Sequence, residues 1–210
     1  MRVLVGPRAD LGRDRVAAGV AGRLAGPAGA VVSLREAGVR NLSRNLSAAE
    51  VSLLREALLG GDATVGYICR GAGTGIAAAA GDAAAGTADP EAGLVAVTDH
   101  ANLTWRSPLT GPNDDRIGPR FPTMARVYAP EAVLDRLGAG EGMMVMLGMV
   151  AGVLDDGRLS GYEMEVARAQ GFAVASSELV PVVIVAAHLG LRVAAVVVIA
   201  GSQEKETRGG

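Results

Sequence analysis

Short apolar runs alternate with amphipathic stretches along most of this chain. Apolar runs bounded by glycine or polar residues are typical of buried strands, and apolar residues three or four positions apart predict helices. The runs predict strands over residues 2–6, 29–34, 63–69, 93–100, 142–152, 172–176 and 191–201. The amphipathic stretches predict helices over residues 14–26, 47–61, 129–140, 160–171 and 179–190.

This alternation predicts an α/β fold with three layers, in which a mixed, largely parallel sheet is flanked by helices. The helix over 47–61 has the clearest boundaries, because Ser47 and Glu50 form a capping-box pattern and two glycines follow it. Ligands of such sheets bind beyond the carboxyl ends of the strands. One rim is therefore expected to gather the segments after Cys69, His100, Met149, Ser176 and Gly201.

The chain has 210 residues, enough for one well-formed core, and we expect a single domain over residues 1–210. Half of the residues are hydrophobic but only 3% are aromatic, so the core must consist of Val, Leu, Ile and Ala. The net charge is −2 and there is no basic block, which argues against nucleic acid as a partner. Cys69 is the sole cysteine, so no intramolecular disulfide can form, which fits a cytoplasmic location.

Two apolar stretches are long enough to raise the question of a membrane. Residues 142–154 are too few to span a bilayer as a helix. Residues 179–201 suffice in number, but Pro181, His188 and Arg192 interrupt them, so a helix followed by a strand is the better interpretation. We therefore expect a cytoplasmic protein without a membrane partner.

A polar, proline-rich segment breaks the pattern between His100 and Met124. Its prolines restrict the unfolded chain and so reduce the entropy lost when a long loop becomes ordered. Its Asn and Asp side chains can bind nearby backbone amides, and its arginines can pair with the carboxylates. We expect an ordered loop that braces a subunit contact or covers a site.

The run VTDHANLTWRSPLTGPNDDRIGPRFPTM, residues 97–124, resembles the signature of the trimeric purine nucleoside phosphorylases. That signature reads D-H-x-N-L, then P-L-x-G-P-N-D-x-R-x-G-x-R-F-P. A second block, VPVVIVAAHLGLRV at residues 180–193, resembles the V-P-E-V-x-x-A-R-H-x-G-L-R-V segment of the same family. The resemblance implies a nucleoside-phosphorylase-like fold, a homotrimer and phosphorolysis of purine nucleosides. It also implies that Phe121 reaches into the sugar site of the neighbouring subunit.

Against this family the chain departs at the elements that bind phosphate. The G-S-G turn after the first strand reads Gly6-Pro7-Arg8, which loses a hydroxyl and a backbone donor. The R-x-H motif is replaced by REAGVRNLS, where Arg40 or Arg35 stands for the arginine and Asn41 is nearest to the histidine. The N-A-A-G-G turn becomes RGAGTG over residues 70–75. If phosphate binding is retained, the resemblance implies that Arg8, Arg40 and Arg70 supply it.

Departures continue in the second half of the chain. The family's G-M-S-T-V-P-E becomes SSELVPV, so that Ser177 matches the methionine and Glu178 the phosphate-binding serine. A carboxylate repels phosphate unless it is protonated. The purine-binding asparagine aligns with Gly201, and we expect the domain to lack the family's C-terminal helix.

The family's aromatic–Glu pair, which binds the base, has two possible counterparts. Tyr162-Glu163 matches it if an insertion precedes the pair, whereas an alignment without gaps places Leu159 there. Both alternatives stay open at this point.

The candidate catalytic residues are therefore Glu178, as general acid or base, together with Glu163 and Tyr162. A charge that favours the N-terminus of the following helix is the alternative role for Glu178. The candidate substrate-binding residues are Arg40, Asn41, Arg70, Ala72, Gly73, Phe121, Ser177 and Gly201. No cofactor or metal is expected, because Asp155-Asp156-Gly157 reads as an exposed turn without a second ligand cluster.

Loop and packing signatures persist while the phosphate, ribose and base contacts are replaced together. The leading hypothesis is accordingly an enzyme whose old nucleoside pocket now serves another small molecule without phosphate chemistry. A cyclase or isomerase of secondary metabolism is the reaction class suggested, using Glu178, Glu163 or Tyr162. The alternatives are a residual purine nucleoside phosphorylase acting on inosine or guanosine, and a non-catalytic scaffold subunit.

Overall fold

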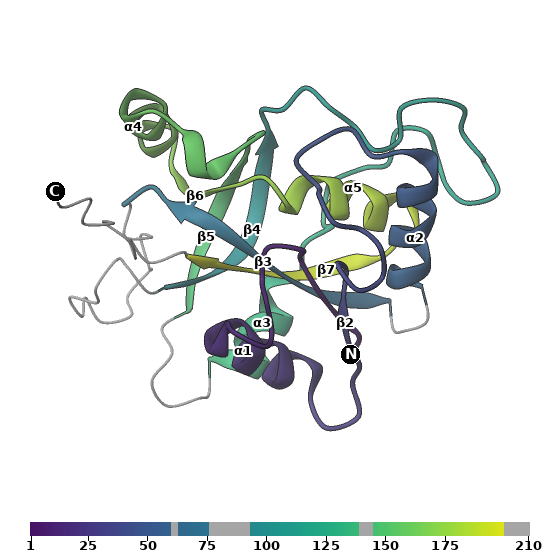
Figure 1. The fold of residues 1–210 in the computed structure, drawn as a ribbon, viewed down its shortest axis with the longest axis horizontal. Helices are drawn as coiled ribbons and strands as arrows, with labels where there is room; N and C mark the ends of the chain where they lie inside the picture. Colours follow the sequence, from purple (N-terminus) through teal and green to yellow (C-terminus); the bar gives the residue numbers. More distant parts are fainter. Residues whose placement is uncertain (60–62, 76–92, 139–144, 200–210) are drawn as a thin grey trace, which may run out of the picture.

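A computed structural model describes residues 1–59, 63–75, 93–138 and 145–199 of the chain (Figure 1). These ranges contain strands β1 Val3–Val5, β2 Val31–Ser33, β3 Thr64–Gly73, β4 Leu94–Asn102, β5 Val145–Gly152, β6 Phe172–Ser176 and β7 Arg192–Ile199. The helices are α1 Arg15–Ala25, α2 Ala48–Leu58, α3 Pro130–Leu137, α4 Gly161–Ala169 and α5 Leu179–His188, with a 3-10 turn, η1, at Asp156–Arg158. Every helix and strand expected from the sequence therefore has a counterpart.

Local sequence signals fix several of these boundaries. Helix α2 begins with the expected capping box, in which Ser47 Oγ accepts from the Glu50 N–H at 3.3 Å and the Ser47 N–H donates to Glu50 Oε2 at 3.0 Å. The apolar stretch over 179–201 splits into α5 and β7, and none of the described helices is long and apolar enough to cross a membrane. One prediction was wrong: residues 70–73 continue strand β3 instead of forming a turn.

The sheet has the order β2-β1-β3-β6-β5-β4-β7, and β3 also pairs with β7. This additional pairing closes five strands into a ring, from which β1 and β2 extend at one side. Five of the pairings are parallel, and β3–β6 and β4–β7 are antiparallel. The predicted mixed, largely parallel sheet flanked by helices is thus confirmed, whereas its closure was not predicted.

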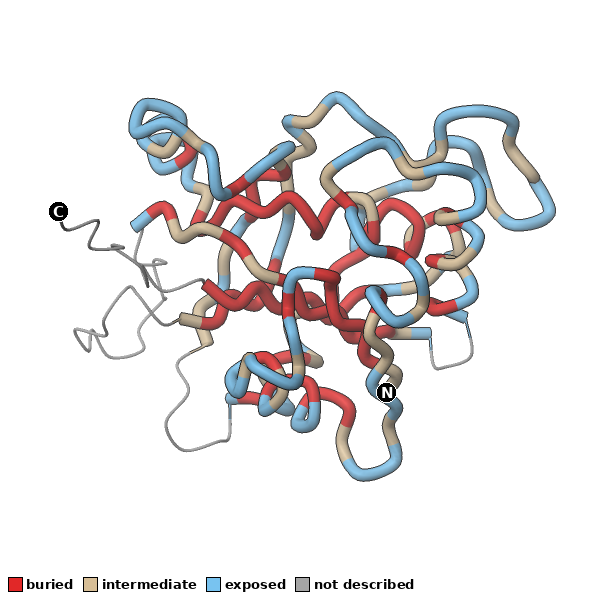
Figure 2. Tube along the Cα trace, viewed as in Figure 1, coloured by how far each residue is buried: buried red, intermediate tan, exposed pale blue. Residues whose placement is uncertain are grey.

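Two apolar cores lie on the two faces of this sheet. In Figure 1, α1 and α3 lie on one side of the strands, and α2 and α5 lie on the other. Alternate residues of β7 divide between them, with Val193, Ala195 and Val197 in the core of α2 and α5 and the residues between in the other. Helix α5 is apolar on nearly all sides, which explains why Figure 2 shows it buried together with the strands.

The long polar segment after β4 is an ordered loop that runs over α2 and α5 (Figure 1). Arg106 Nη1 donates to the Ser43 backbone carbonyl at 3.0 Å, and the buried imidazole of His188 lies with Nδ1 3.0 Å from the Pro119 carbonyl oxygen. The loop returns to the sheet where the Ala129 N–H donates to the Val193 carbonyl. His188 therefore holds the loop, and a role for the loop at a subunit contact stays a prediction.

Gly118 is a sensitive point of this loop, because a Cβ placed there would lie 1.9 Å from the His188 carbonyl oxygen. Gly118→Ala is expected to lower the free energy of unfolding by about 1–3 kcal/mol, since neither backbone can yield without disturbing the loop. Gly19→Ala in α1 is the matched control, because its Cβ meets nothing within 4 Å and alanine favours a helix. Urea unfolding followed by circular dichroism measures both; equal or higher stability of Gly118→Ala would contradict the placement of the loop.

Candidate functional site

Three segments meet beyond the ends of their strands and form a cluster of charged side chains. They are Gly6–Arg8 after β1, η1 after β5, and Ser177-Glu178 between β6 and α5. The Arg8 backbone N–H donates to Glu178 Oε1 at 2.9 Å, and Ser177 Oγ donates to Asp156 Oδ1 at 2.6 Å. The rim expected from the sequence therefore contains a site in which Arg8 meets Asp156, 148 positions away, and Glu178, 170 positions away.

Glu178 is the central group of this site, with only 1% of its surface exposed. Its carboxyl lies against Gly6, where a Cβ would come within 2.9 Å of Oε2, and Oε2 has no hydrogen-bond partner among the described residues. Burial raises the pKa of Glu178 to about 7, although the backbone amides of Arg8 and Arg70 and the charge of Arg8 favour the carboxylate. As the N-cap residue of α5, Glu178 makes no side-chain cap hydrogen bond, so its carboxyl faces the turn after β1.

Tyr67 and Cys69 of β3 lie beneath this carboxyl in the core. The Tyr67 hydroxyl donates to the backbone carbonyl of Glu178 at 3.2 Å. Ser176 Oγ, 3.7 Å from Cys69 Sγ, donates to the Arg70 carbonyl at 3.0 Å. Burial raises the pKa of both Tyr67 and Cys69, so each stays neutral and serves as packing.

Asp156 is the second carboxylate of the site, and the sequence analysis misplaced it. Residues 155–157 were expected to be an exposed turn, but Asp156 is only 5% exposed. Its Oδ1 forms an ion pair with Arg8 Nη1 and also accepts from the Ser177 N–H at 3.3 Å. Arg8 Nη1 lies 3.1 Å from Ser177 Oγ as well. The charge of Arg8 is thus matched within the protein.

A polar cavity of about 310 Å³ opens beside these groups. Its lining includes Arg8, Arg40, Asn41, Ser43, Leu154, Asp155, Ser177 and Glu178. Arg40 is exposed and has no hydrogen-bond or ion-pair partner among the residues that the structure describes. Asn41 Oδ1 accepts from the backbone N–H of Ser43 at 2.8 Å, which orders the segment that follows Arg40. Four candidate residues, Arg40, Asn41, Ser177 and Glu178, therefore share this cavity with Arg8.

The glycine-rich segment of β3 does not take part in this cavity. Arg70 forms an ion pair with Asp14, in which Nε and Nη2 of Arg70 donate to Oδ2 of Asp14 at 2.8 Å and 2.5 Å. Ala72 and Gly73, expected in an anion-binding turn, are strand residues paired with Ala175 and Val174 of β6. Their backbone groups are engaged in the sheet, which corrects the expectation of a substrate-binding turn there.

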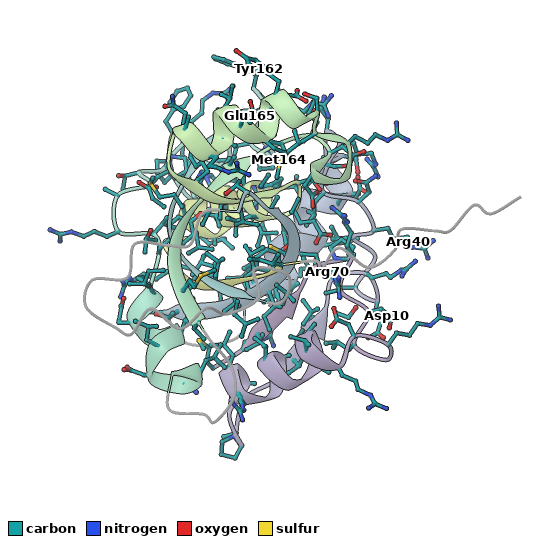
Figure 3. The ribbon with its side chains drawn as sticks, turned by 90° about the vertical axis from the view of Figure 1, so that its left-hand side faces the viewer. Asp10, Arg40, Arg70, Tyr162, Met164 and Glu165 are labelled. Carbon is teal, nitrogen blue, oxygen red and sulfur yellow. The ribbon has the colours of Figure 1, made fainter. Side chains whose placement is uncertain are left out.

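A second, apolar cavity of about 870 Å³ lies between α4 and the ends of β4, β5 and β6. Tyr162 and Glu163 line it, and so does Leu159, so both alternatives for the aromatic–Glu position face one space. In Figure 3, Tyr162 projects from α4 far from Arg40 and Arg70. Glu163 instead caps its own helix, with Oε2 accepting from the Ser160 N–H at 2.8 Å, which lowers the pKa of Glu163. The structure therefore does not bring Glu163 and Tyr162 together with Glu178.

Two further candidates lie away from both cavities or outside the described chain. Phe121 is 86% exposed on the long loop, where the Arg120 guanidinium carbon lies 5.9 Å from the centre of its ring. Gly201 lies outside the described residues. Asp14, the partner of Arg70, was not among the residues expected at the site, and Asp156 was expected in an exposed turn. The position of Asp156 after the carboxyl end of a predicted strand is the signal that could have marked it.

Comparisons with known proteins agree on one superfamily. The family model described as "Phosphorylase superfamily" matches residues 83–209. Purine nucleoside phosphorylase 1 of Bacillus subtilis (strain 168) is 30% identical over 102 residues, 48% of this chain and 38% of that protein. The purine nucleoside phosphorylase of Anopheles gambiae is 44% identical over 54 residues, 23% of this chain and 15% of that protein.

Solved structures of similar fold carry the same name. A Schistosoma purine nucleoside phosphorylase in complex with guanosine has a TM-score of 0.60 at 22% identity, covering 77% of this chain and 61% of that one. Isoform 2 from Schistosoma mansoni, in complex with cytosine and ribose-1-phosphate, has a TM-score of 0.55 at 25% identity, covering 74% and 54%. The chain thus spans less than two thirds of the length of each of these proteins.

The buried carboxyl of Glu178 predicts a stability that depends on pH in an unusual direction. Because its pKa in the folded chain is about 7, against an ordinary value of 4.5, the folded state holds a proton that the unfolded state releases between these values. Glu178 therefore destabilises the fold as pH rises from about 4.5 to 7, by roughly 3 kcal/mol. Glu178→Gln is expected to match the parent near pH 4.5 and to exceed it in stability by 2–3 kcal/mol, to order of magnitude, at pH 8.

Glu163→Gln is the control of opposite sign, because hydrogen bonds from Ser160 lower the pKa of Glu163. Its loss is expected to reduce stability at neutral pH and to leave it unchanged in acid. Chemical unfolding at a series of pH values measures both variants. A Glu178→Gln variant that is no more stable than the parent at pH 8 would show that burial does not raise the pKa of Glu178 in the folded chain.

Proposed function

This chain belongs to the phosphorylase superfamily, and we propose that it is an enzyme that transforms a small molecule by proton transfer through Glu178, without inorganic phosphate. The observation that carries this proposal is the position of the Glu178 carboxyl. It fills the turn after β1, accepts the Arg8 N–H at 2.9 Å and lines the polar cavity. A carboxyl of the protein thus takes the backbone donor that an incoming anion would need at this turn.

The hydrogen-bond donors around Glu178 support chemistry without phosphate. In the turn after β1, the Gly6 N–H donates to the Ile68 carbonyl, Pro7 has no N–H, and the Arg8 N–H is taken by Glu178. The Ser177 hydroxyl and the Arg8 guanidinium both bind Asp156. A phosphate dianion would have to displace these internal contacts and lie beside two carboxyl groups. Desolvation of a dianion needs free donors and positive charge, and at this turn the backbone donor, the hydroxyl and the Arg8 charge are already engaged.

A carboxyl group that titrates near pH 7 is well suited to acid–base catalysis. Near neutrality both of its forms are present, so it can accept a proton from one atom of a substrate and return it to another. Such a cycle leaves Glu178 as it began and consumes no co-substrate, so the product is an isomer of the substrate. An isomerisation or a cyclisation is therefore the reaction class that we propose.

A second candidate is phosphorolysis of purine nucleosides. It is favoured by the names of the relatives, which are purine nucleoside phosphorylases. Within this chain it is favoured by Arg40, which lines the polar cavity and has no partner among the described residues. Because the chain spans only 38% of the Bacillus subtilis relative, that protein's name does not by itself transfer an activity.

Turnover by the parent chain and by Glu178→Gln tests the proposal. Both are incubated with a library of nucleosides and larger apolar metabolites, with and without phosphate, and products are identified by chromatography and mass spectrometry. We expect a product of unchanged mass, formed without phosphate and at least roughly 100-fold more slowly by Glu178→Gln, because the proton-transfer group is lost. Glu131→Gln on α3, a residue that lines neither of the two cavities, should retain the rate. Phosphate-dependent release of free base from inosine or guanosine, persisting in Glu178→Gln, would instead establish the second candidate.

Removal of the Glu178 carboxyl is expected to open an anion site. Glu178→Ser frees the Arg8 N–H and removes a negative charge, so inorganic phosphate should bind to this variant at millimolar concentration or below, to order of magnitude, and not to the parent. Calorimetric titration with phosphate measures the difference, and Glu163→Ser on α4 is the matched control. If the parent binds phosphate as tightly as Glu178→Ser, the carboxyl does not occupy the anion position.

A further inference from the structure

Several exposed apolar side chains gather around the apolar cavity beside α4. Leu103 after β4, Leu154 after β5, and Tyr162 and Val166 on α4 all line it and are all exposed. Single exposed apolar residues are ordinary on a protein surface, but a group around one concavity marks a binding site. At about 870 Å³ this space lies near the upper end of the range for small-molecule sites.

Most polar groups at the edge of this cavity are hydrogen-bonded or ion-paired within the protein. Glu163 Oε2 is held by the N–H of Ser160, and Arg158 lies 3.5 Å from Asp155. A ring system rich in hydrogen-bond donors and acceptors would lose its water contacts here without gaining matched partners. The lining therefore favours an apolar body over a purine.

The two cavities are neighbours, because Leu154 and Asp155 line both of them. On the polar side Arg40 offers an unpaired positive charge among the described residues, while the charge of Arg8 is matched by Asp156. One uncommitted guanidinium suits a ligand head with one negative charge better than a dianion. A molecule that extends across Leu154 would place its head beside Arg40, in the cavity that Glu178 also lines, and its body against α4.

We propose that the apolar and polar cavities together bind one amphipathic small molecule, with a large apolar body against α4 and a monoanionic carboxylate head beside Arg40. This inference rests on the proposed function in assigning the polar cavity to the reacting end of the ligand. It names the class of substrate on which Glu178 acts, and it gives the apolar residues around α4 a role in recognition.

Competition binding tests this inference directly. The fluorescent probe 1-anilinonaphthalene-8-sulfonate, which combines an apolar ring system with one negative charge, is titrated into the protein, and dodecanoate or inosine is added as competitor. We expect one saturable site per chain, displacement by dodecanoate, and no displacement by inosine at equal concentration. Displacement by inosine at lower concentration than dodecanoate would overturn the inference, because the cavity would then favour a nucleoside.

Variants on two walls of the cavity locate the site. Val166→Asp on α4 and Leu103→Asp after β4 each place a charge in the lining, and each is expected to weaken probe binding at least tenfold. Gly161→Asp is the matched control, because helical periodicity places residue 161 on the face of α4 away from the cavity and a Cβ there meets nothing within 4 Å. Arg40→Gln should weaken dodecanoate several-fold more than the neutral analogue dodecanamide. Cooperative thermal unfolding of each variant verifies its fold.

Equal probe binding by the parent and by both cavity variants would contradict the inference. A loss of probe binding in Gly161→Asp as large as in the cavity variants would contradict it as well. The outcome is separable from that of the proposed function, since none of these variants alters Glu178. If Glu178→Gln keeps full turnover while Val166→Asp loses the probe, the proton-transfer proposal fails and the ligand class stands. If Glu178→Gln is inactive while inosine is the better competitor, the ligand class fails and the proton-transfer proposal stands.

Discussion

Strand β3 is hydrogen-bonded to three other strands, and this pairing determines where the segments of the rim lie. Residues Thr64–Gly71 pair with β7, and Gly66–Ile68 among them also pair with β1. The last two residues of β3, Ala72 and Gly73, pair with β6 in the opposite direction. Because β6 runs antiparallel beside the end of β3, the chain leaves β6 next to the turn after β1. Ser176 then binds the Arg70 carbonyl, and the start of α5 is fixed against β3. The meeting of Glu178 and Arg8, 170 residues apart, follows from this arrangement.

The two acids of the site have contrasting surroundings although they lie in one cluster. Asp156 meets a guanidinium, a hydroxyl and a backbone N–H. Glu178 is buried and accepts one hydrogen bond, from the Arg8 N–H to Oε1, while Oε2 accepts none from the described residues. Environments that differ in this way assign different tasks to the same functional group. Asp156 orders Arg8 and Ser177, and Glu178 is the group with a proton to exchange near neutral pH.

The sequence was sufficient for the succession of helices and strands, because each apolar run and each cap acts over a few residues. The capping box of Ser47 and Glu50 and the interruption of residues 179–201 are such local signals. Closure of the sheet was not predictable in this way, since the β3–β7 pairing joins segments more than 100 residues apart. The same limit explains the site: Glu178 was recognised from its neighbours in the chain, whereas the burial of Asp156 and the Arg70–Asp14 ion pair depend on segments that meet only in the fold.

Gly6 makes this carboxyl-filled turn possible, because any side chain there would collide with both Glu178 and Tyr67, whose oxygens lie 2.9 Å from the position of a Cβ. The two positions therefore constrain each other during evolution. While residue 178 is a glutamate, alanine at position 6 requires both the Glu178 carboxyl and the Tyr67 hydroxyl to shift. A change at either position is thus felt at the other, so that glycine at 6 and glutamate at 178 act as one packing unit joining the first turn of the chain to the start of α5.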